Sequence, residues 1–291
     1  MQPITTAVIL AAGLGTRMLP ATKSVPKEML PIVDRPLVQY CVDEAVAGGL
    51  TEIVFVIAEG KEAIRSHFEA GTRVERALRE TGNEDAANEL LAIGARATFH
   101  YVLQDRQLGI AHAVNCARHL LEGKPFALMF PDDLLLGPSC IGELVAAQEH
   151  APGSMIAVET VPDSDVSQYG IVDPVDSDNP AALRRVVEKP ALADAPSRLG
   201  IVGRYILSET IFTHIDGIPL GKGGELQITD ALASQIEAGE TVSCFKFSAT
   251  RYDTGRPLGY LTASVAAAMD RPEIAANLLE RLRPLLNSGE R

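Results

Sequence analysis

The sequence lacks the features that mark several large classes of protein. Its four cysteines lie far apart and form no C-x-x-C pair, so neither a zinc site nor a disulfide framework is indicated. The first apolar run is short and has no Lys or Arg before it, and no apolar stretch approaches the roughly 18 residues of a membrane span. We therefore expect reduced cysteines, no membrane partner and a cytoplasmic location.

Positive charge is scarce as well. The chain has 26 Lys and Arg against 38 Asp and Glu, which gives a formal net charge of −12. Nucleic acids and anionic membranes favour a basic surface, so neither is expected as the main partner. A small anionic substrate needs only local positive charge. The N-terminal stretch supplies it through Arg17, Lys23 and Lys27 against the single acid Glu28.

The N-terminal stretch has the pattern of a strand that leads into an anion-binding loop. An apolar run at 7–12 is followed by a glycine turn at Gly13 and Gly15. Such a run, bounded by glycine, is typical of a buried parallel strand, and the glycines let backbone N–H groups approach an anion closely. A dinucleotide fingerprint would have Gly in place of Met18, and a P-loop would continue as Gly-Lys-Ser/Thr, so the loop matches neither motif.

After this loop, predicted strands alternate with predicted helices. We expect further strands at 52–58, 98–104, 125–130, 155–161, 200–207 and 242–247. We expect helices at 36–48, 61–70, 109–121, 141–150, 228–237, 256–270 and 273–286. This order predicts an α/β fold with right-handed crossovers, namely a doubly wound, mostly parallel, Rossmann-like mixed sheet flanked by helices. Ligands of such sheets bind at the carboxyl ends of the strands.

Three regions depart from the simple alternation. The segment 163–196 is rich in Pro, Asp and Ser and contains two short alternating runs, 170–175 and 184–188, which we interpret as a smaller β subregion. The acidic helical segment 73–93 is interpreted as a solvated face or a subunit contact. The Ala-rich stretch 261–269 is compatible with packing on a neighbouring subunit or within its own chain. With no obvious linker, we expect one domain over 1–291, with halves at 1–135 and 136–255 and C-terminal helices over 256–291.

The stretch GLGTRMLPATKSVPKEMLP, from Gly13 to Pro31, resembles the signature of the nucleotidyltransferases that make nucleoside-diphosphate sugars. The form of the signature is that of the bacterial UTP:glucose-1-phosphate uridylyltransferases, and the resemblance covers most of the chain. It implies uridylyl transfer from UTP to α-D-glucose 1-phosphate with Mg²⁺, and a homo-oligomer, either a dimer or a tetramer. Such a transfer needs charge neutralisation and in-line positioning rather than a covalent nucleophile, which suits Arg and Lys beside a glycine turn.

The resemblance also implies a nucleotide site. Arg17 and Lys27 would contact the triphosphate as catalytic residues, and Glu28 and Gln104 would hydrogen-bond the uracil edge. A Glu oxygen accepts from the uracil N3–H and a Gln amide both donates and accepts, so this pair suits uracil better than cytosine. The implied nucleotide-binding residues are Ala12, Gly13, Gly15, Thr16, Glu28, Gln104 and Gly109. Without the resemblance, Glu28 would be interpreted as a surface acid beside Lys27.

A sugar-phosphate site is implied by the E-K-P element at Glu188, Lys189 and Pro190. Glu188 would accept from the glucose hydroxyls, and Lys189 would meet the sugar phosphate as a third catalytic residue. The implied sugar-binding residues are Gly170, Glu188, Val202 and Gly203. Taken alone, an E-K pair before proline would be interpreted as an exposed strand end.

Two acids are implied as metal ligands. Asp132 follows the predicted strand 125–130, and its position resembles that of the family's magnesium ligand, whereas Asp253 in Y-D-T-G resembles a second acidic position. Mg²⁺ prefers carboxylate oxygens and usually takes one or two from the protein. The alternation of side chains along a strand points Asp133 to the other face. A D-T-G triplet by itself is equally compatible with an ordinary turn.

Two other functions are compatible with the sequence. A thymidylyl or other nucleotide specificity is the nearest enzymatic alternative, but the P-K-E-M stretch and the 73–93 segment resemble the uridylyl type. A non-catalytic sugar-nucleotide sensor of the same fold would have lost the phosphate and metal groups, whereas Arg17, Lys27 and Asp132 are all present. The six histidines show no shared spacing and no acidic partner pattern, so no catalytic role is predicted for them.

Overall fold

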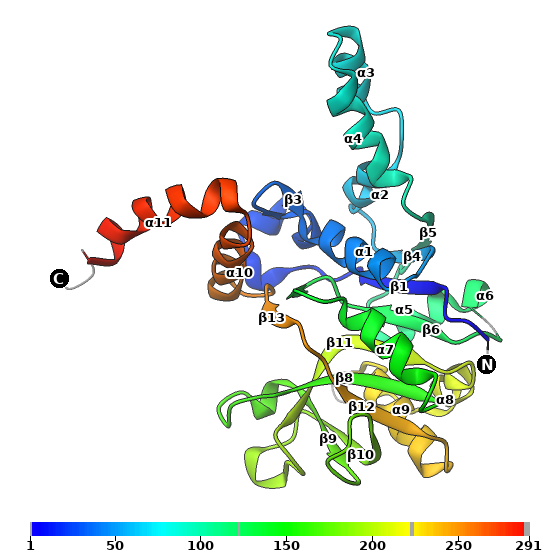
Figure 1. Cartoon of the computed structure of the whole chain (residues 1–291). Helices are drawn as coiled ribbons and strands as arrows, with labels where there is room; N and C mark the ends of the chain where they lie inside the picture. The colour runs from blue at the N-terminus through cyan, green and yellow to red at the C-terminus, as the bar shows by residue number, and fades with distance from the viewer. Residues whose placement is uncertain (1, 122, 222–223, 288–291) are drawn as a thin grey trace.

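The computed structural model describes residues 2–121, 123–221 and 224–287 (Figure 1). Its centre is a nine-stranded sheet with the strand order β5-β4-β1-β6-β11-β8-β12-β10-β9. The strands of this sheet are β1 (Thr6–Ala11), β4 (Glu52–Ile57), β5 (Thr98–Leu103), β6 (Phe126–Met129), β8 (Ser154–Thr160), β9 (Gly170–Pro174), β10 (Ala181–Glu188), β11 (Leu199–Leu207) and β12 (Val242–Lys246). A small hairpin of β2 (Pro31–Ile32) and β3 (Arg35–Pro36) precedes the first helix.

The strands β5, β4, β1 and β6 form the parallel part of the sheet. β1 pairs in parallel with both β4 and β6, and β4 pairs in parallel with β5. β11 then runs antiparallel to β6 and to β8, so the sheet is mixed beyond β6. The predicted α/β fold with a mixed sheet is confirmed. The sheet is parallel in only four of its eight neighbouring strand pairs, so it is less parallel than predicted. The two short runs predicted as a β subregion, β9 and β10, extend this same sheet at its β12 edge.

Helices cover both faces of the sheet because successive strand residues point to opposite sides. Ile9 and Phe55 are buried against α1 (Leu37–Ala47), α2 (Glu62–Phe68) and α7 (Cys140–Gln148). Val8 and Val54 are buried against α5 (Ile110–Cys116), α8 (Ile211–Gly217) and α9 (Ile228–Glu237). A short helix, α6 (Arg118–Leu121), follows α5. Burial of both faces explains why these strands are almost wholly apolar in sequence.

The acidic segment predicted as helical forms two helices, α3 (Arg73–Glu80) and α4 (Glu84–Gly94), which pack on each other and project from the body (Figure 1). The Thr72 hydroxyl caps α3 by accepting from Glu75 N at 3.3 Å. At the C-terminus, α10 (Pro257–Met269) packs on β2, and α11 (Pro272–Asn287) points away from the sheet (Figure 1). None of the helices in the described ranges has the length and apolar character needed to cross a membrane.

A two-stranded ribbon that the sequence did not predict joins the end of β6 to the C-terminal part of the chain. β7 (Asp133–Leu136) pairs antiparallel with β13 (Thr250–Asp253), and this register places Asp253 opposite Asp133. Each strand has four residues, too few for an alternating pattern to stand out. Because Asp132 directly precedes β7, the ribbon brings the two predicted metal ligands to the same edge of the sheet.

Candidate active site

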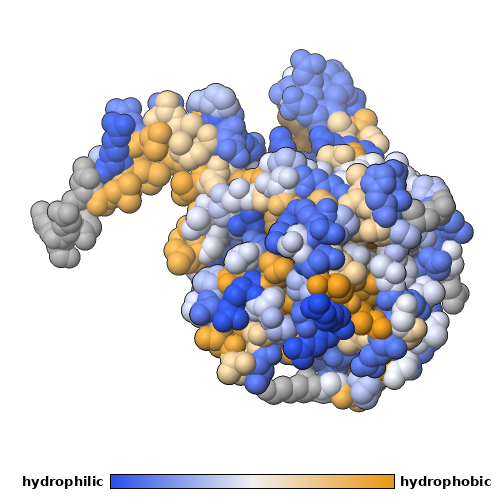
Figure 2. All heavy atoms as spheres, turned by 60° about the horizontal axis from the view of Figure 1, so that its bottom comes forward, coloured by the Kyte–Doolittle hydropathy of each residue, from blue (hydrophilic) through white to orange (hydrophobic). Residues whose placement is uncertain are grey.

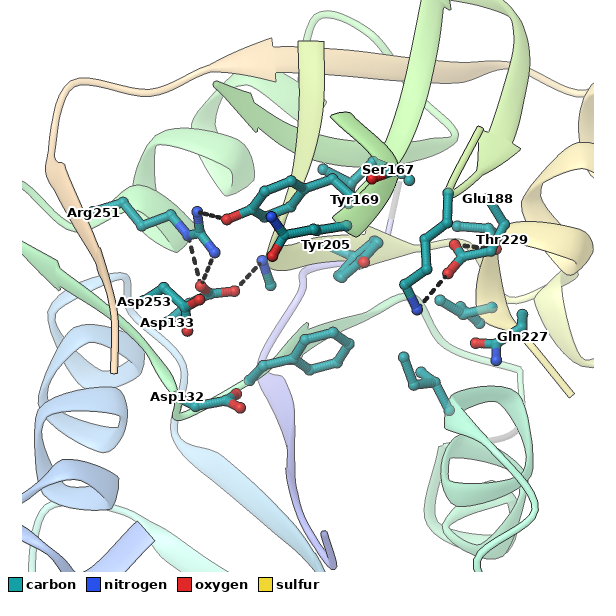
Figure 3. Close-up of a pocket in the computed structure, with 18 of the residues that line it drawn as sticks. Asp132, Asp133, Ser167, Tyr169, Glu188, Tyr205, Gln227, Thr229, Arg251 and Asp253 are labelled. Atoms are coloured by element: carbon teal, nitrogen blue, oxygen red, sulfur yellow. Dashed lines mark hydrogen bonds and ion pairs between the residues drawn. The ribbon is translucent and has the colours of Figure 1, made fainter. Parts of the chain in front are cut away.

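Two cavities open at the carboxyl ends of β1 and β6, where ligands gather in doubly wound sheets. The β1 cavity has a volume of about 300 Å³, and its lining includes Ala12, Gly13, Lys27, Gln104 and Gly109. The β11 cavity has a volume of about 490 Å³, and its lining includes Arg17, Tyr169, Gly170, Glu188, Gly203, Arg251 and Asp253 (Figure 3). Five residues line both cavities and form a shared wall, namely Ile110, Phe130, Asp132, Lys189 and Gln227.

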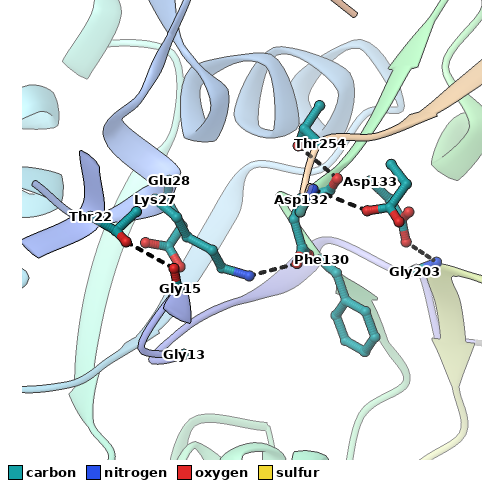
Figure 4. A network of polar contacts seen from close by, with 12 residues as sticks. Gly13, Gly15, Thr22, Lys27, Glu28, Phe130, Asp132, Asp133, Gly203 and Thr254 are labelled. Atoms are coloured by element: carbon teal, nitrogen blue, oxygen red, sulfur yellow. Dashed lines mark hydrogen bonds and ion pairs between the residues drawn. The ribbon is translucent and has the colours of Figure 1, made fainter. Parts of the chain in front are cut away.

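An ion pair between Lys27 and Asp132 lies at this shared wall (Figure 4). Lys27 Nζ is 2.5 Å from Asp132 Oδ2. Burial alone would raise the pKa of Asp132, but the charge and hydrogen bond of Lys27 outweigh it and hold that pKa below its usual value. Burial also opposes the charge of Lys27, yet its attraction to Asp132 and Glu28 raises its pKa. Both groups are therefore charged at neutral pH, and an anionic ligand near Lys27 must compete with Asp132.

A second ion pair, which the sequence analysis missed, lies behind the glycine turn. Lys61 Nζ donates to the two carboxylate oxygens of Glu28, at 2.9 and 2.7 Å, and to the Gly13 carbonyl at 2.6 Å. An ammonium group has three N–H donors, so all of them are used within the protein. Glu28 is 1% exposed and lines neither cavity. Its predicted contact with uracil stays a prediction, and the contacts that Lys61 makes hold the Gly13 backbone in place.

The other side of the β1 cavity is formed by Gln104, Gln107 and Gly109. Gly109 has φ +98°, and a Cβ atom there would lie 2.5 Å from a neighbouring backbone oxygen, so glycine is required. Gln104 is 6% exposed and donates through Nε2 to His112 Nδ1 at 3.0 Å. Gln107, which the sequence analysis did not single out, donates to the Ala12 carbonyl at 3.0 Å. The cavity thus has polar groups in fixed positions beside the apolar side chains of Leu10, Ile110 and Phe130.

Asp133 belongs to a network on the opposite side from Lys27 (Figures 3 and 4). Its carboxylate accepts from Gly203 N at 2.9 Å and from Arg251 Nε at 2.6 Å. Arg251 also donates to Glu159 Oε1 at 2.5 Å and to the Tyr169 hydroxyl at 3.1 Å. A Cβ atom on Gly203 would lie 2.6 Å from the Asp133 carboxylate, so this contact requires glycine. Asp133 nevertheless lines the β11 cavity together with Asp132 and Asp253, so its predicted orientation away from a metal ion stays a prediction.

Arg204 holds the turn that carries Asp132. It is 1% exposed on β11 and donates to the backbone carbonyls of Phe130 and Asp133, at 2.8 and 2.9 Å. Its charge is balanced by Glu44 on α1, at 2.7 Å. Burial opposes that charge, but the attraction to Glu44 outweighs burial and raises the pKa of Arg204. The signal in the sequence was an arginine inside an apolar strand, G-I-V-G-R-Y-I-L.

Glu188, at the end of β10 (Figure 3), and the neighbouring Lys189 both line the β11 cavity. Glu188 Oε2 accepts from the Thr229 hydroxyl at 3.1 Å, and Glu188 Oε1 is 3.0 Å from Lys189 Nζ. Lys189 has φ +45°, a conformation that is uncommon for a residue with a side chain and disfavoured before proline. Its own N–H donates to the Tyr169 carbonyl at 3.1 Å, which helps to hold this conformation. Backbone strain of this kind clusters at functional sites.

The residues around Asp132 fit a divalent cation that is shared with phosphate oxygens. Asp132 and Asp253 both line the β11 cavity. Thr254 donates from its N–H, at 2.9 Å, and from its hydroxyl, at 2.7 Å, to the Asp132 carbonyl, so the two acidic turns are tied together. Within the described residues, no group of three or more His, Cys, Asp or Glu could hold a metal alone. Mg²⁺ usually takes only one or two protein carboxylates, with water and phosphate completing its shell.

Some predicted site residues lie outside the cavities. The predicted nucleotide residues that line neither cavity are Gly15, Thr16 and Glu28. The side chain of Val202 is fully buried in the core with α1 and α7, which leaves only its backbone for a ligand. Arg17, predicted to contact the triphosphate, lines the β11 cavity and not the β1 cavity. The ligand contacts of these residues stay predictions.

Comparison with known proteins shows what the whole chain is similar to. Residues 6–269 match the family model described as nucleotidyl transferase. The chain is 38% identical over 292 residues to a UTP–glucose-1-phosphate uridylyltransferase of Bacillus subtilis, covering 100% of both chains. A UTP-bound UGPase from Acinetobacter baumannii superposes with a TM-score of 0.89 at 35% identity, covering 96% of this chain and 98% of that one. A UDP-glucose pyrophosphorylase complexed with UDP-glucose gives 0.83 at 35% identity, covering 92% and 100%.

Proposed function

The chain belongs to the nucleotidyl transferase family, and on this basis we propose that it transfers a uridylyl group from UTP to α-D-glucose 1-phosphate. The products are UDP-glucose and pyrophosphate. Full-length similarity to a uridylyltransferase and to UTP-bound and UDP-glucose-bound structures supports both substrates. The structural observation that carries the proposal is the shared wall, because ligands in the two cavities would meet at Asp132 and Lys189.

We assign the β1 cavity, lined mostly by the half 1–135, to the nucleotide and the β11 cavity, lined mostly by the half 136–255, to the sugar phosphate. A phosphate oxygen of glucose 1-phosphate attacks the α-phosphorus of UTP in line. The bond from the α-phosphorus to the oxygen that bridges it to the β-phosphorus breaks, and pyrophosphate leaves with the electron pair. No proton transfer is required, so positioning and charge neutralisation are the main contributions of the protein.

The charged residues have distinct tasks in this reaction. Lys27 neutralises the phosphates of UTP from the β1 cavity, and Arg17 does so from the β11 cavity, where the triphosphate would extend past the shared wall. Lys189 orients the phosphate of the sugar. Glu188 accepts hydrogen bonds from the glucose hydroxyls, and Thr229 holds it in place. Lys27 is paired with Asp132 in the structure. When the triphosphate binds, its phosphate oxygens compete with Asp132 for the ammonium group of Lys27.

We propose Asp132 and Asp253 as the protein ligands of Mg²⁺. Bound there, the ion would neutralise charge on the phosphates, and it offsets the repulsion between an Asp carboxylate and a triphosphate. The experiment is turnover in excess chelator, followed by addition of Mg²⁺. Loss and recovery of pyrophosphate release are expected, and full activity in chelator would remove the metal from the proposal.

We further propose a homo-oligomer, a dimer or a tetramer, in which α10 and α11 are covered. Leu258 and Leu261 on α10 are 78% and 61% exposed, and Leu279 and Leu286 on α11 are 43% and 74% exposed. Apolar side chains run along the projecting α11 (Figure 2). Light scattering should report a dimer or a tetramer, and Leu261→Glu should shift the protein toward the monomer.

The three buried free cysteines, Cys41, Cys140 and Cys244, support the proposal of a reducing, cytoplasmic location.

Product analysis tests the proposed reaction against its alternatives. The purified protein is incubated with each of the four common nucleoside triphosphates and with several sugar 1-phosphates, and pyrophosphate and nucleotide sugar are measured. The highest kcat/KM is expected with UTP and glucose 1-phosphate. A preference for dTTP would indicate thymidylyl transfer, and UDP-glucose binding without turnover would indicate a sensor.

A further inference from the structure

Gln104 and His112 form a pair at the wall of the β1 cavity. Gln104 directly follows β5, and its Nε2 donates to His112 Nδ1 at 3.0 Å. The same Nε2 is 3.5 Å from the Gly109 carbonyl oxygen. His112 lies on α5, and Cys116 Sγ, one turn later on this helix, is 3.9 Å from the same ring nitrogen. His112 was assigned no role from the sequence and lines neither cavity.

These neighbours determine which way the Gln104 amide faces. A backbone carbonyl oxygen can only accept, so the amide nitrogen and not the amide oxygen must face Gly109. His112 Nδ1 also accepts from the amide nitrogen, which requires the tautomer with its proton on Nε2. A thiol is a weak donor, so the nearby Cys116 is compatible with an accepting Nδ1. Both N–H bonds of the amide are therefore directed into the protein.

The amide oxygen of Gln104 is left for a ligand. In the described part of the chain no donor binds Gln104 Oε1. This atom is also absent from the set of fully buried polar atoms without a partner, so it is not fully buried. Because Gln104 lines the β1 cavity, the oxygen is the polar group that it offers there. Uracil carries a donor at N3, whereas cytosine carries a lone pair at that position. An acceptor at this wall binds the first base and repels the second.

We propose that His112 is a positioning residue for base selection: by holding the Gln104 amide nitrogen, it keeps the amide oxygen toward the base and so favours UTP over CTP. The proposal rests on the proposed function, because it takes the β1 cavity as the nucleotide site. If the amide turned over, its NH₂ group would face the cavity and would favour the cytosine N3. The choice between the two bases is thus set by a residue that does not touch the nucleotide.

The test compares nucleotide selection in variants that lose or keep the acceptor. His112→Phe removes the acceptor but keeps a ring, and His112→Ala removes both the acceptor and the ring. His112→Asn keeps a side-chain oxygen that can accept from Gln104. His119→Phe, an exposed histidine on α6, is the matched control. For each protein, kcat/KM with glucose 1-phosphate is measured for UTP and for CTP, and equilibrium binding of the two nucleotides is measured without sugar phosphate.

Loss of the acceptor should lower the UTP:CTP ratio by about tenfold, the effect of one hydrogen bond worth roughly 1.4 kcal/mol. His112→Asn and His119→Phe should keep the ratio within about threefold of wild type. A merely structural role would lower both nucleotides equally, so an unchanged ratio in His112→Phe and His112→Ala overturns the inference. Equilibrium binding distinguishes failure of this inference from failure of the proposed function. If the wild-type protein binds neither nucleotide, both the inference and the proposed function are overturned.

Discussion

Replacing Lys61 by methionine would leave the Glu28 carboxylate buried without a counter-charge. The two groups are 2.7 Å apart, and Glu28 and Lys61 are 1% and 7% exposed. At an effective dielectric constant of about 20, their attraction is about 6 kcal/mol. Removing both ions from water offsets most of this gain, but loss of one partner leaves the other charge uncompensated. We therefore expect Lys61→Met to lower the free energy of unfolding by about 3–5 kcal/mol at pH 7.

The assay is urea unfolding of a set of matched variants. Lys61→Met combined with Glu28→Gln removes both charges, and this double variant should be more stable than Lys61→Met alone. Lys23→Met, which removes an exposed lysine of the same N-terminal segment, should change the unfolding free energy by less than about 0.5 kcal/mol. A Lys61→Met protein within about 1 kcal/mol of wild type would refute the reasoning, as would a double variant whose loss equals the sum of the single losses.

The stability of the Lys61→Met variant should depend on pH in a definite direction. Burial raises the pKa of the Glu28 carboxyl, and the nearby Lys61 and Lys27 charges counteract only part of that rise. Without Lys61 the rise should be larger, so the folded variant should bind a proton more tightly than the unfolded chain does. The contribution of Glu28 to the stability of the variant is then greatest at acid pH and is lost as the pH rises through the folded pKa of Glu28. The difference in unfolding free energy between the variant and wild type should narrow as the pH falls toward about 4.5, the pKa of Glu28 in the unfolded chain.

Three further substitutions separate the roles of the site residues. Asp132→Asn should remove most metal-dependent turnover with little change in the thermal midpoint, whereas Asp133→Asn should lower the midpoint because it removes the buried carboxylate that accepts from Gly203 and Arg251; the opposite pattern would place the metal at Asp133. Lys189→Ala should raise KM for glucose 1-phosphate far more than it changes UTP affinity, measured by titration without the sugar phosphate; equal damage to both would mean that the cavities are assigned wrongly. Lys27→Ala should lower kcat roughly 10²-fold or more with an unchanged circular dichroism spectrum, and wild-type turnover would remove Lys27 from the mechanism.

Local patterns were sufficient for much of the fold and for the sheet edge at which the candidate site lies. The apolar run before Gly13 and the regular alternation of strands and helices predicted the parallel strands and their carboxyl edge. Asp132 could be placed because it lies just beyond the end of a buried strand, and Gly109 because it precedes a helix. Each of these inferences depends on residues that are close together in the sequence.

The supporting network was not predicted, because its partners are far apart in the chain. Lys61 is 33 positions from Glu28, Arg251 is 118 positions from Asp133, and Arg204 is 160 positions from Glu44. No spacing rule joins such residues, and only the fold brings them together. A charged residue inside an apolar strand, such as Arg204, was the one signal in the sequence, because a buried charge requires a partner.

The burial of Glu28 shows how a correct motif can still leave a residue's contacts open. Beside Lys27 in sequence, Glu28 could be a surface acid or a base-contacting acid. The structure places it under the glycine turn, where Lys61 binds both of its oxygens. Neither the charge pattern nor the neighbouring residues indicate this third arrangement, which depends on where α2 begins.

Direct transfer between two bound substrates is tested most directly by the stereochemistry at the α-phosphorus. One diastereomer of UTPαS is converted with glucose 1-phosphate, and the configuration of the thio-substituted UDP-glucose is determined. Ligands that meet at the shared wall of Asp132 and Lys189 should react in a single in-line displacement, which inverts the configuration. Retention would mean two successive displacements through a covalent uridylyl-enzyme, and it would contradict the non-covalent roles of Lys27 and Lys189.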